Sequence, residues 1–139
     1  MNESNEFNSD FFNRLDINIA NYEILGSALL IYGYYEFIMA SNLDKANAYN
    51  EMAGIESSLG DPILILVSGE AKITLGLVIL NFVAYKRFCE QKLKGVTGPN
   101  LEPYNTLVQA YIASVVANFK RLEALEQIAN INASGEGFV

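Results

Sequence analysis

The sequence contains no histidine and only one cysteine, and each scarcity argues against a class of functional site. Histidine is the commonest general acid or base near neutral pH and the commonest metal ligand, so histidine-dependent catalytic triads are excluded. Cys89 has no second cysteine to pair with, so the fold does not depend on an oxidising compartment. Lys86 and Arg87 give this thiol only a weakly cationic setting, so we interpret Cys89 as structural or incidental. We therefore predict that the protein is not an enzyme and has no catalytic residue, metal site or cofactor.

Proline and charged residues are also scarce. The chain has three prolines, and the alternation of β-branched residues that is typical of strands is rare, which favours an all-α fold. Hydrophobic residues make up 51% of the chain and charged residues 18%, an apolar balance for a soluble protein. The net charge is −7, so binding to a phosphate backbone has no electrostatic support, and we expect no nucleic-acid partner.

The first ten residues, MNESNEFNSD, are acidic and polar. A signal peptide would be basic and then apolar, so the predicted location is the cytoplasm. The alternative is a membrane-associated protein, because the middle of the chain is rich in apolar residues.

The residues from Asp61 to Lys94 predict one long helix around which the rest of the chain is organised. Asp61 can cap the first turn, and Pro62 suits the first helical position because it has no amide to leave unpaired. Lys94 lies where the helix dipole favours a cation, and Gly95 suits a left-handed cap. This helix is apolar on nearly every side, which is typical of a central buried element or of a membrane span. Glu70 and Lys72 interrupt it, and charges of this kind are costly inside a bilayer.

Three further helices are expected around the central one. The pattern predicts a long first helix over about 10–40, a short amphipathic helix within 41–60, and a last helix over about 103–131. The chain is therefore predicted to be a single all-α domain over 1–139, a bundle of three long helices and one short helix that packs further into an oligomer. Residues 1–8 and 132–139 are expected to be flexible tails.

A repeat of glycines marks the first and central helices. The segments GSALLIYG, from Gly26 to Gly33, and GEAKITLG, from Gly69 to Gly76, both carry glycines seven residues apart. Seven residues make about two helical turns, so each pair lies on one face, and each glycine costs about 1 kcal/mol relative to alanine in a helix. We therefore predict a close approach of two helices at these glycines, either between subunits or between the first and central helices of one chain.

Isoleucines recur every seven residues along the first helix, at Ile17, Ile24, Ile31 and Ile38. This spacing is typical of a heptad stripe that packs along a second helix. The sequence suggests Ile17, Ile24 and Ile31 as apolar supports for the glycine contact.

Three acids, Glu23, Glu36 and Glu70, lie within apolar helices. Carboxylates on facing helices can build a di-iron or di-manganese site, but such sites need a Glu-x-x-His motif, and this chain has no histidine. Glu70 and Lys72 form a candidate buried polar site. They are two residues apart, so they point to different sides of the helix and cannot pair with each other. A buried, unpaired Glu70 would be a candidate proton site, which is a minor alternative.

Three nearly all-round apolar helices offer more hydrophobic surface than one small bundle can bury. The leading hypothesis is a non-enzymatic helical protein that acts by self-association, as a structural or assembly component whose partner is a second copy of itself. The alternative is a small membrane-associated helical protein, such as a hairpin-type pore, an immunity protein or a regulatory protein.

Overall fold

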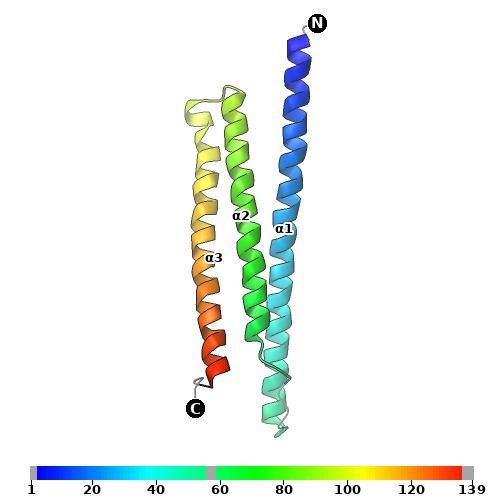
Figure 1. Ribbon diagram of the computed structural model, residues 1–139, viewed down its shortest axis with the longest axis vertical. Coiled ribbons are helices and arrows are strands. Elements are labelled where there is room, and N and C mark those ends of the chain that lie inside the picture. Colours follow the sequence, from blue (N-terminus) through cyan, green and yellow to red (C-terminus); the bar gives the residue numbers. More distant parts are fainter. Residues whose placement is uncertain (1–2, 56–58, 136–139) are drawn as a thin grey trace.

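The chain folds into three long helices that run down, up and down again in the view of Figure 1, from the N-terminus at the top. The computed structural model describes residues 3–55 and 59–135, with side chains described from residue 9 onward. The helices are α1 (Glu3–Met52), α2 (Ile63–Leu93) and α3 (Glu102–Ser134), and a short 3-10 helix, η1 (Gly98–Asn100), precedes α3. These ranges contain no strand, and the all-α bundle predicted from the sequence is confirmed.

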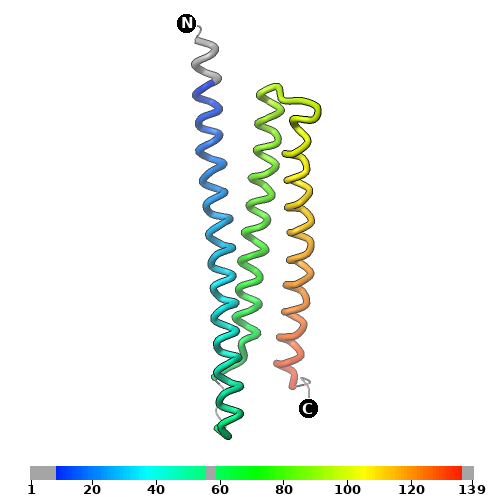
Figure 2. Tube along the Cα trace, turned by 180° about the vertical axis from the view of Figure 1, so that it is seen from behind, coloured from blue at the N-terminus to red at the C-terminus, as the bar shows by residue number. Residues whose placement is uncertain are grey.

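α2 is the central helix, with α1 packed on one side and α3 on the other (Figures 1 and 2). α1 has 50 residues and α2 has 31, so the two rods are about 75 Å and 46 Å long at about 1.5 Å per residue. α1 therefore extends past α2 at both ends, as Figure 1 shows. Part of the surface of α1 is left without a neighbour as a result.

The ends of α2 follow the local signals in the sequence. The Asp61 side chain accepts a hydrogen bond from the backbone amide of Ile63 at 2.9 Å, and Pro62 has the φ of −65° that its ring imposes. At the other end, Gly95 takes a φ of +79°, the left-handed conformation that closes a helix and favours glycine.

The predicted helix boundary near Ser41 is wrong. α1 runs without interruption to Met52, so the expected short helix is the last part of α1 rather than a separate element. No proline or glycine occurs between Gly33 and Gly54, so the polar composition of this stretch does not break the helix. α1 ends just before Gly54, which has a φ of +69°.

The helices also extend into the two segments that were expected to be flexible tails. α1 already begins at Glu3, and α3 continues to Ser134 before Gly135 adopts a φ of +73°. Residues 3–11 contain neither proline nor glycine, so nothing in them stops the helix. Residues 1–2 and 136–139 of the expected tails lie outside the described residues.

Leu59 and Gly60, which precede α2, lie beside the last turns of α1. The Asn47 side chain accepts a hydrogen bond from the Leu59 amide and donates one to the Gly60 carbonyl, both at 2.9 Å. These two bonds tie the connection to α1, because one amide side chain satisfies a backbone donor and a backbone acceptor at once.

Candidate interaction surface and buried ion pairs

The four glycines singled out in the sequence lie where α1 and α2 touch. A Cβ atom on Gly33 would lie 2.6 Å from the Gly69 carbonyl oxygen, and one on Gly26 would lie 3.0 Å from the Gly76 carbonyl oxygen. The reverse contacts are equally close, at 2.8 Å for Gly69 and 2.7 Å for Gly76. Backbone therefore meets backbone at two levels, a spacing that no larger residue permits without a shift. Of the two arrangements considered for these glycines, the structure places them within one chain, and we call this contact the glycine seam.

The isoleucines suggested as its supports lie elsewhere. Ile17, Ile24 and Ile31 are 64%, 68% and 72% exposed, so they point away from α2 rather than into the glycine seam. The residues that do line the seam are Leu80, Ile73 and Phe37, whose side chains come within about 3 Å of the added Cβ positions. The heptad stripe of isoleucines is thus a separate feature of the outer face of α1.

An ion pair lies beside the glycine seam and links α1 to α2. The Lys72 ammonium donates to both carboxylate oxygens of Glu36, at 2.8 and 2.9 Å, and to the Ser68 hydroxyl at 2.6 Å. It also lies 5.4 Å from the centre of the Tyr32 ring. Lys72 is therefore well satisfied where it is partly buried, which offsets much of the cost of removing its charge from water.

A cluster of charges links α1 to α2 nearer the C-terminal end of α2, around Arg87. Its guanidinium pairs with Asp16 and lies 3.8 Å from Glu23 and 3.6 Å from Glu90. Glu90 is only 1% exposed and accepts a hydrogen bond from Lys94. That hydrogen bond raises the pKa of Lys94 above its usual value, because it stabilises the ammonium form.

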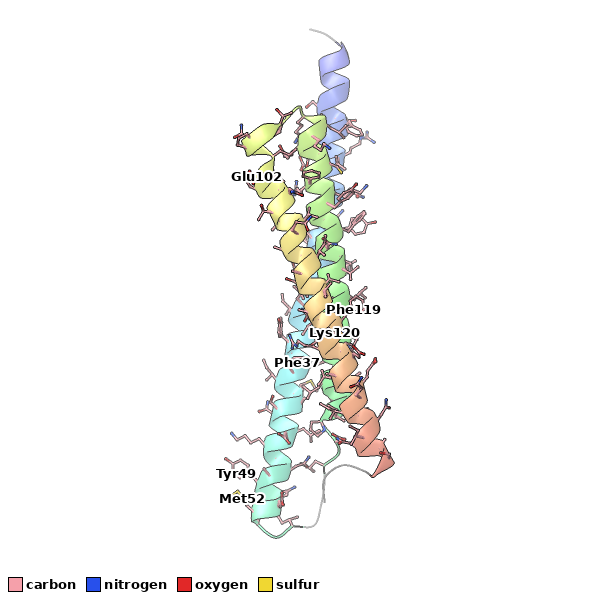
Figure 3. The ribbon with its side chains drawn as sticks, turned by 90° about the vertical axis from the view of Figure 1, so that its left-hand side faces the viewer. Phe37, Tyr49, Met52, Glu102, Phe119 and Lys120 are labelled. Atoms are coloured by element: carbon pink, nitrogen blue, oxygen red, sulfur yellow. The ribbon has the colours of Figure 1, made fainter. Side chains whose placement is uncertain are left out.

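Glu70 is fully buried and faces α3 rather than α1. Its carboxylate lies 2.9 Å from the Arg121 guanidinium, which also lies over the Phe37 ring at 5.6 Å from the centroid. Figure 3 shows Phe37 at the level of Phe119 and Lys120, the two residues that precede Arg121 on α3. Residues of all three helices come together at this ion pair.

Burial raises the pKa of Glu70, and the nearby Arg121 charge partly offsets this by lowering it. The geometry leaves both Glu70 oxygens without a hydrogen bond from the described residues. A carboxylate held in this way is stabilised by one charge alone, so we expect its ionised form to be costly.

The sequence singled out Glu70, Lys72 and Glu36, but it predicted neither the pairing of Lys72 with Glu36 nor Arg121 as the partner of Glu70. The spacing of Glu70 and Lys72 placed them on different sides of α2, and the structure joins Lys72 to α1 and Glu70 to α3. Arg121 was not singled out, although it is a cation in the amphipathic half of the last helix. The only signal that could have found it is the shortage of cations, since the chain has 9 lysines and arginines for 16 acids.

Most of the large hydrophobic side chains stay on the surface. In the part of the chain that the structure describes, 8 hydrophobic residues are buried, whereas 27 large hydrophobic residues are exposed. The exposed set extends over all three helices, with Ile38, Phe82 and Phe119 among its members. Within α3 only Val108 is buried. The single chain therefore has a small core and an extensive apolar surface.

The described residues include no group of three or more histidine, cysteine, aspartate or glutamate side chains placed to hold a metal ion. Each buried carboxylate faces a lysine or an arginine instead, as Glu70 and Glu90 show. What this arrangement can do chemically is to fix helix positions through charge pairs and to present apolar surface. Comparison of the chain with protein-family models, with curated proteins and with solved structures gives no match.

Proposed function

We propose that this protein acts by self-association, as a non-enzymatic structural or assembly component. The observation that carries the proposal is the accessible surface of the single chain, 9686 Å². A compact monomer of this mass, 15.4 kDa, exposes about 7,200 Å². The excess of about 2,500 Å² is more than the roughly 800 Å² that each partner contributes to a standard protein interface.

The construction of the bundle supports the same proposal. The glycine seam and the ion pairs of Lys72 and Arg87 fix α1 against α2, so the outer face of this pair is held in one shape. A rigid apolar face binds a partner with a smaller loss of conformational entropy than a flexible one. The net charge of −7 keeps such an assembly soluble.

Light scattering on a sizing column, without detergent, tests the proposal. The expected result is a soluble particle of defined mass that is a multiple of 15.4 kDa and that dissociates on dilution. A monomer at all concentrations would refute self-association.

A second candidate is membrane association, because two helical segments, Ser9–Met52 and Ile63–Leu93, are long and apolar enough to cross a bilayer. Against it, the uncharged middle of each helix is short. It covers residues 24–35 in α1 and 73–85 in α2, about 18 and 20 Å against a hydrocarbon core of about 30 Å. Cell fractionation separates the two candidates. Recovery only from membranes, and only with detergent, would favour the second.

A further inference from the structure

The outer face of α1 carries a row of isoleucines that no other part of the described chain covers. Ile17, Ile24, Ile31 and Ile38 are each between 61% and 72% exposed, and we call them the isoleucine ridge. The opposite face of α1, packed on α2, keeps the same seven-residue period. Its buried residues on this period are Ile19, Gly26, Gly33 and Ala40. Because both faces share one period, the ridge stays straight along the outside of the α1–α2 pair.

The ridge ends in opposite charges. Continuing the period by one heptad in each direction leads to Asp10 before Ile17 and to Lys45 after Ile38, and both residues are exposed. Along the outer face of α1 the order is therefore one acidic residue, four isoleucines and one basic residue. Three residue pairs share one midpoint in the sequence, between Ser27 and Ala28. These pairs are Asp10 with Lys45, Ile17 with Ile38, and Ile24 with Ile31.

We propose that the ridge is the contact at which a second copy of this chain docks, with the two α1 helices antiparallel and related by a two-fold axis between Ser27 and Ala28. In this register Ile17 faces Ile38 of the second copy. Asp10 faces its Lys45, and each pair occurs twice because the interface is the same on both subunits. The inference rests on the proposed self-association and adds which face, which direction and which register.

Charge selects the antiparallel direction. In a parallel pair Asp10 would face a second Asp10, and Lys45 a second Lys45, so both ends of the ridge would repel. Arg14 already pairs with Asp10 within α1, at 2.9 Å. A carboxylate has acceptor positions for more than one donor, so Asp10 can bind its own Arg14 and a facing lysine together.

The shape of the surface fits the same axis. A shallow hollow lies at the middle of the ridge and is lined by Ala20, Glu23, Ile24, Ser27, Ala28 and Ile31. Its floor consists of small side chains, which let a facing helix come close, and an isoleucine from the second copy can insert there as a knob into a hole. A lipid surface would use the apolar ridge but not the opposite charges at its two ends, which is why a protein helix is the favoured occupant.

Charge reversal tests the register. Asp10→Lys and Lys45→Glu each place like charges opposite one another twice per dimer, and each alone should raise the dimer dissociation constant about tenfold at low salt. Mixed in equal amounts, the two variants should pair with each other and recover the affinity of the natural sequence. Asp44→Lys is the matched control, since it changes the same charge beside Lys45 but on the side that faces Asp61 and Ile63. Sedimentation velocity at several concentrations gives the dissociation constants.

Cysteine cross-linking gives an independent test in a Cys89→Ala background. Ile17→Cys and Ile38→Cys should form little disulfide-linked dimer alone, because identical positions lie about 31 Å apart in this register. The mixture of the two variants should cross-link readily.

The outcomes separate this inference from the proposed function. Cross-linking of either variant alone would establish a parallel pair and overturn the inference. A stable dimer that is insensitive to the charge reversals and gives no mixed cross-link would place the interface on another face, so the inference would fail and self-association would stand. A monomer, or a protein found only in membranes, would overturn both.

Discussion

The two helix contacts of this bundle are built in different ways. α1 and α2 meet backbone to backbone at four glycines, and the ion pairs of Lys72 and Arg87 also link the two helices. α3 meets α2 through side chains. One residue of α3 is buried. The polar contacts of α3 with this part of the described bundle are the Glu70–Arg121 ion pair and a hydrogen bond near the end of α3.

The comparison teaches that the first contact is specified by shape and the second by a few side chains. A backbone contact tolerates no added atoms, so it fixes the register of α1 on α2. A contact made by one buried ion pair and a thin apolar stripe is weaker and depends on protonation. We therefore expect α3 to open before α1 and α2 separate, as a lower-stability unit of the fold.

The largest expected effect is at the glycine seam. Gly33→Leu places its first added atom 2.6 Å from the Gly69 carbonyl oxygen and from an Ile73 side-chain carbon. Overpacking of this kind should lower the free energy of unfolding by about 3 kcal/mol, measured by urea denaturation followed by circular dichroism. Ala71→Leu, which places the same leucine side chain on an exposed part of α2, is the control and should change little. Equal stability of Gly33→Leu and the natural protein would show that shape does not specify this contact.

Removal of the cation from the α2–α3 contact should have a smaller effect. Arg121→Met keeps an apolar side chain over Phe37 but leaves the buried Glu70 carboxylate without its countercharge. We expect a loss of about 1–2 kcal/mol in unfolding free energy, with faster hydrogen exchange confined to α3. Lys120→Met is the matched control because Lys120 is 78% exposed and pairs within α3 with Glu123. Faster exchange throughout α1 and α2 would contradict a separable α3.

The protonation state of Glu70 should make the α2–α3 contact dependent on pH. Its pKa is raised in the folded protein above the usual 4.5, so the folded state holds the proton more tightly than the unfolded state. Stability contributed by this group is therefore full below pH 4.5 and falls as the pH rises through the folded pKa. Glu70→Gln should remove this part of the pH dependence. Denaturant titrations of both proteins across that window give the comparison, and identical slopes would mean that Glu70 is not protonated more readily on folding.

Some features of the fold could be predicted from the sequence, and others could not. The ends of α2 were predictable because Asp61, Pro62 and Gly95 act locally, and the all-α class followed from apolar periodicity. The length of α1 was not predictable from the sequence. The polar composition after Ser41 resembles a helix start, whereas only a glycine or a proline would have ended the helix.

The candidate sites could likewise be predicted only in part. Glycine spacing in the sequence pointed to a close helix approach, since glycine has few other uses inside a helix. The partner of Glu70 depends on which face of α3 turns toward α2, which is a property of packing rather than of local sequence. The isoleucines were visible as a stripe, but their direction, away from α2, was set by the glycines on the opposite face of the same helix.

The smallest expected effect is at the end of α3. The Asn132 side chain donates a hydrogen bond of 3.0 Å to Asp61, whose other oxygen caps the start of α2. Because the bond is exposed to water, Asn132→Ala should lower the unfolding free energy by only about 0.5 kcal/mol. Its effect should appear as faster hydrogen exchange in the last turn of α3 alone. Asn130→Ala, the same change at an exposed position of that turn, controls for helix propensity. If both variants speed exchange equally, the bond to Asp61 does not hold this end, and Glu70–Arg121 is left as the main polar link between α2 and α3.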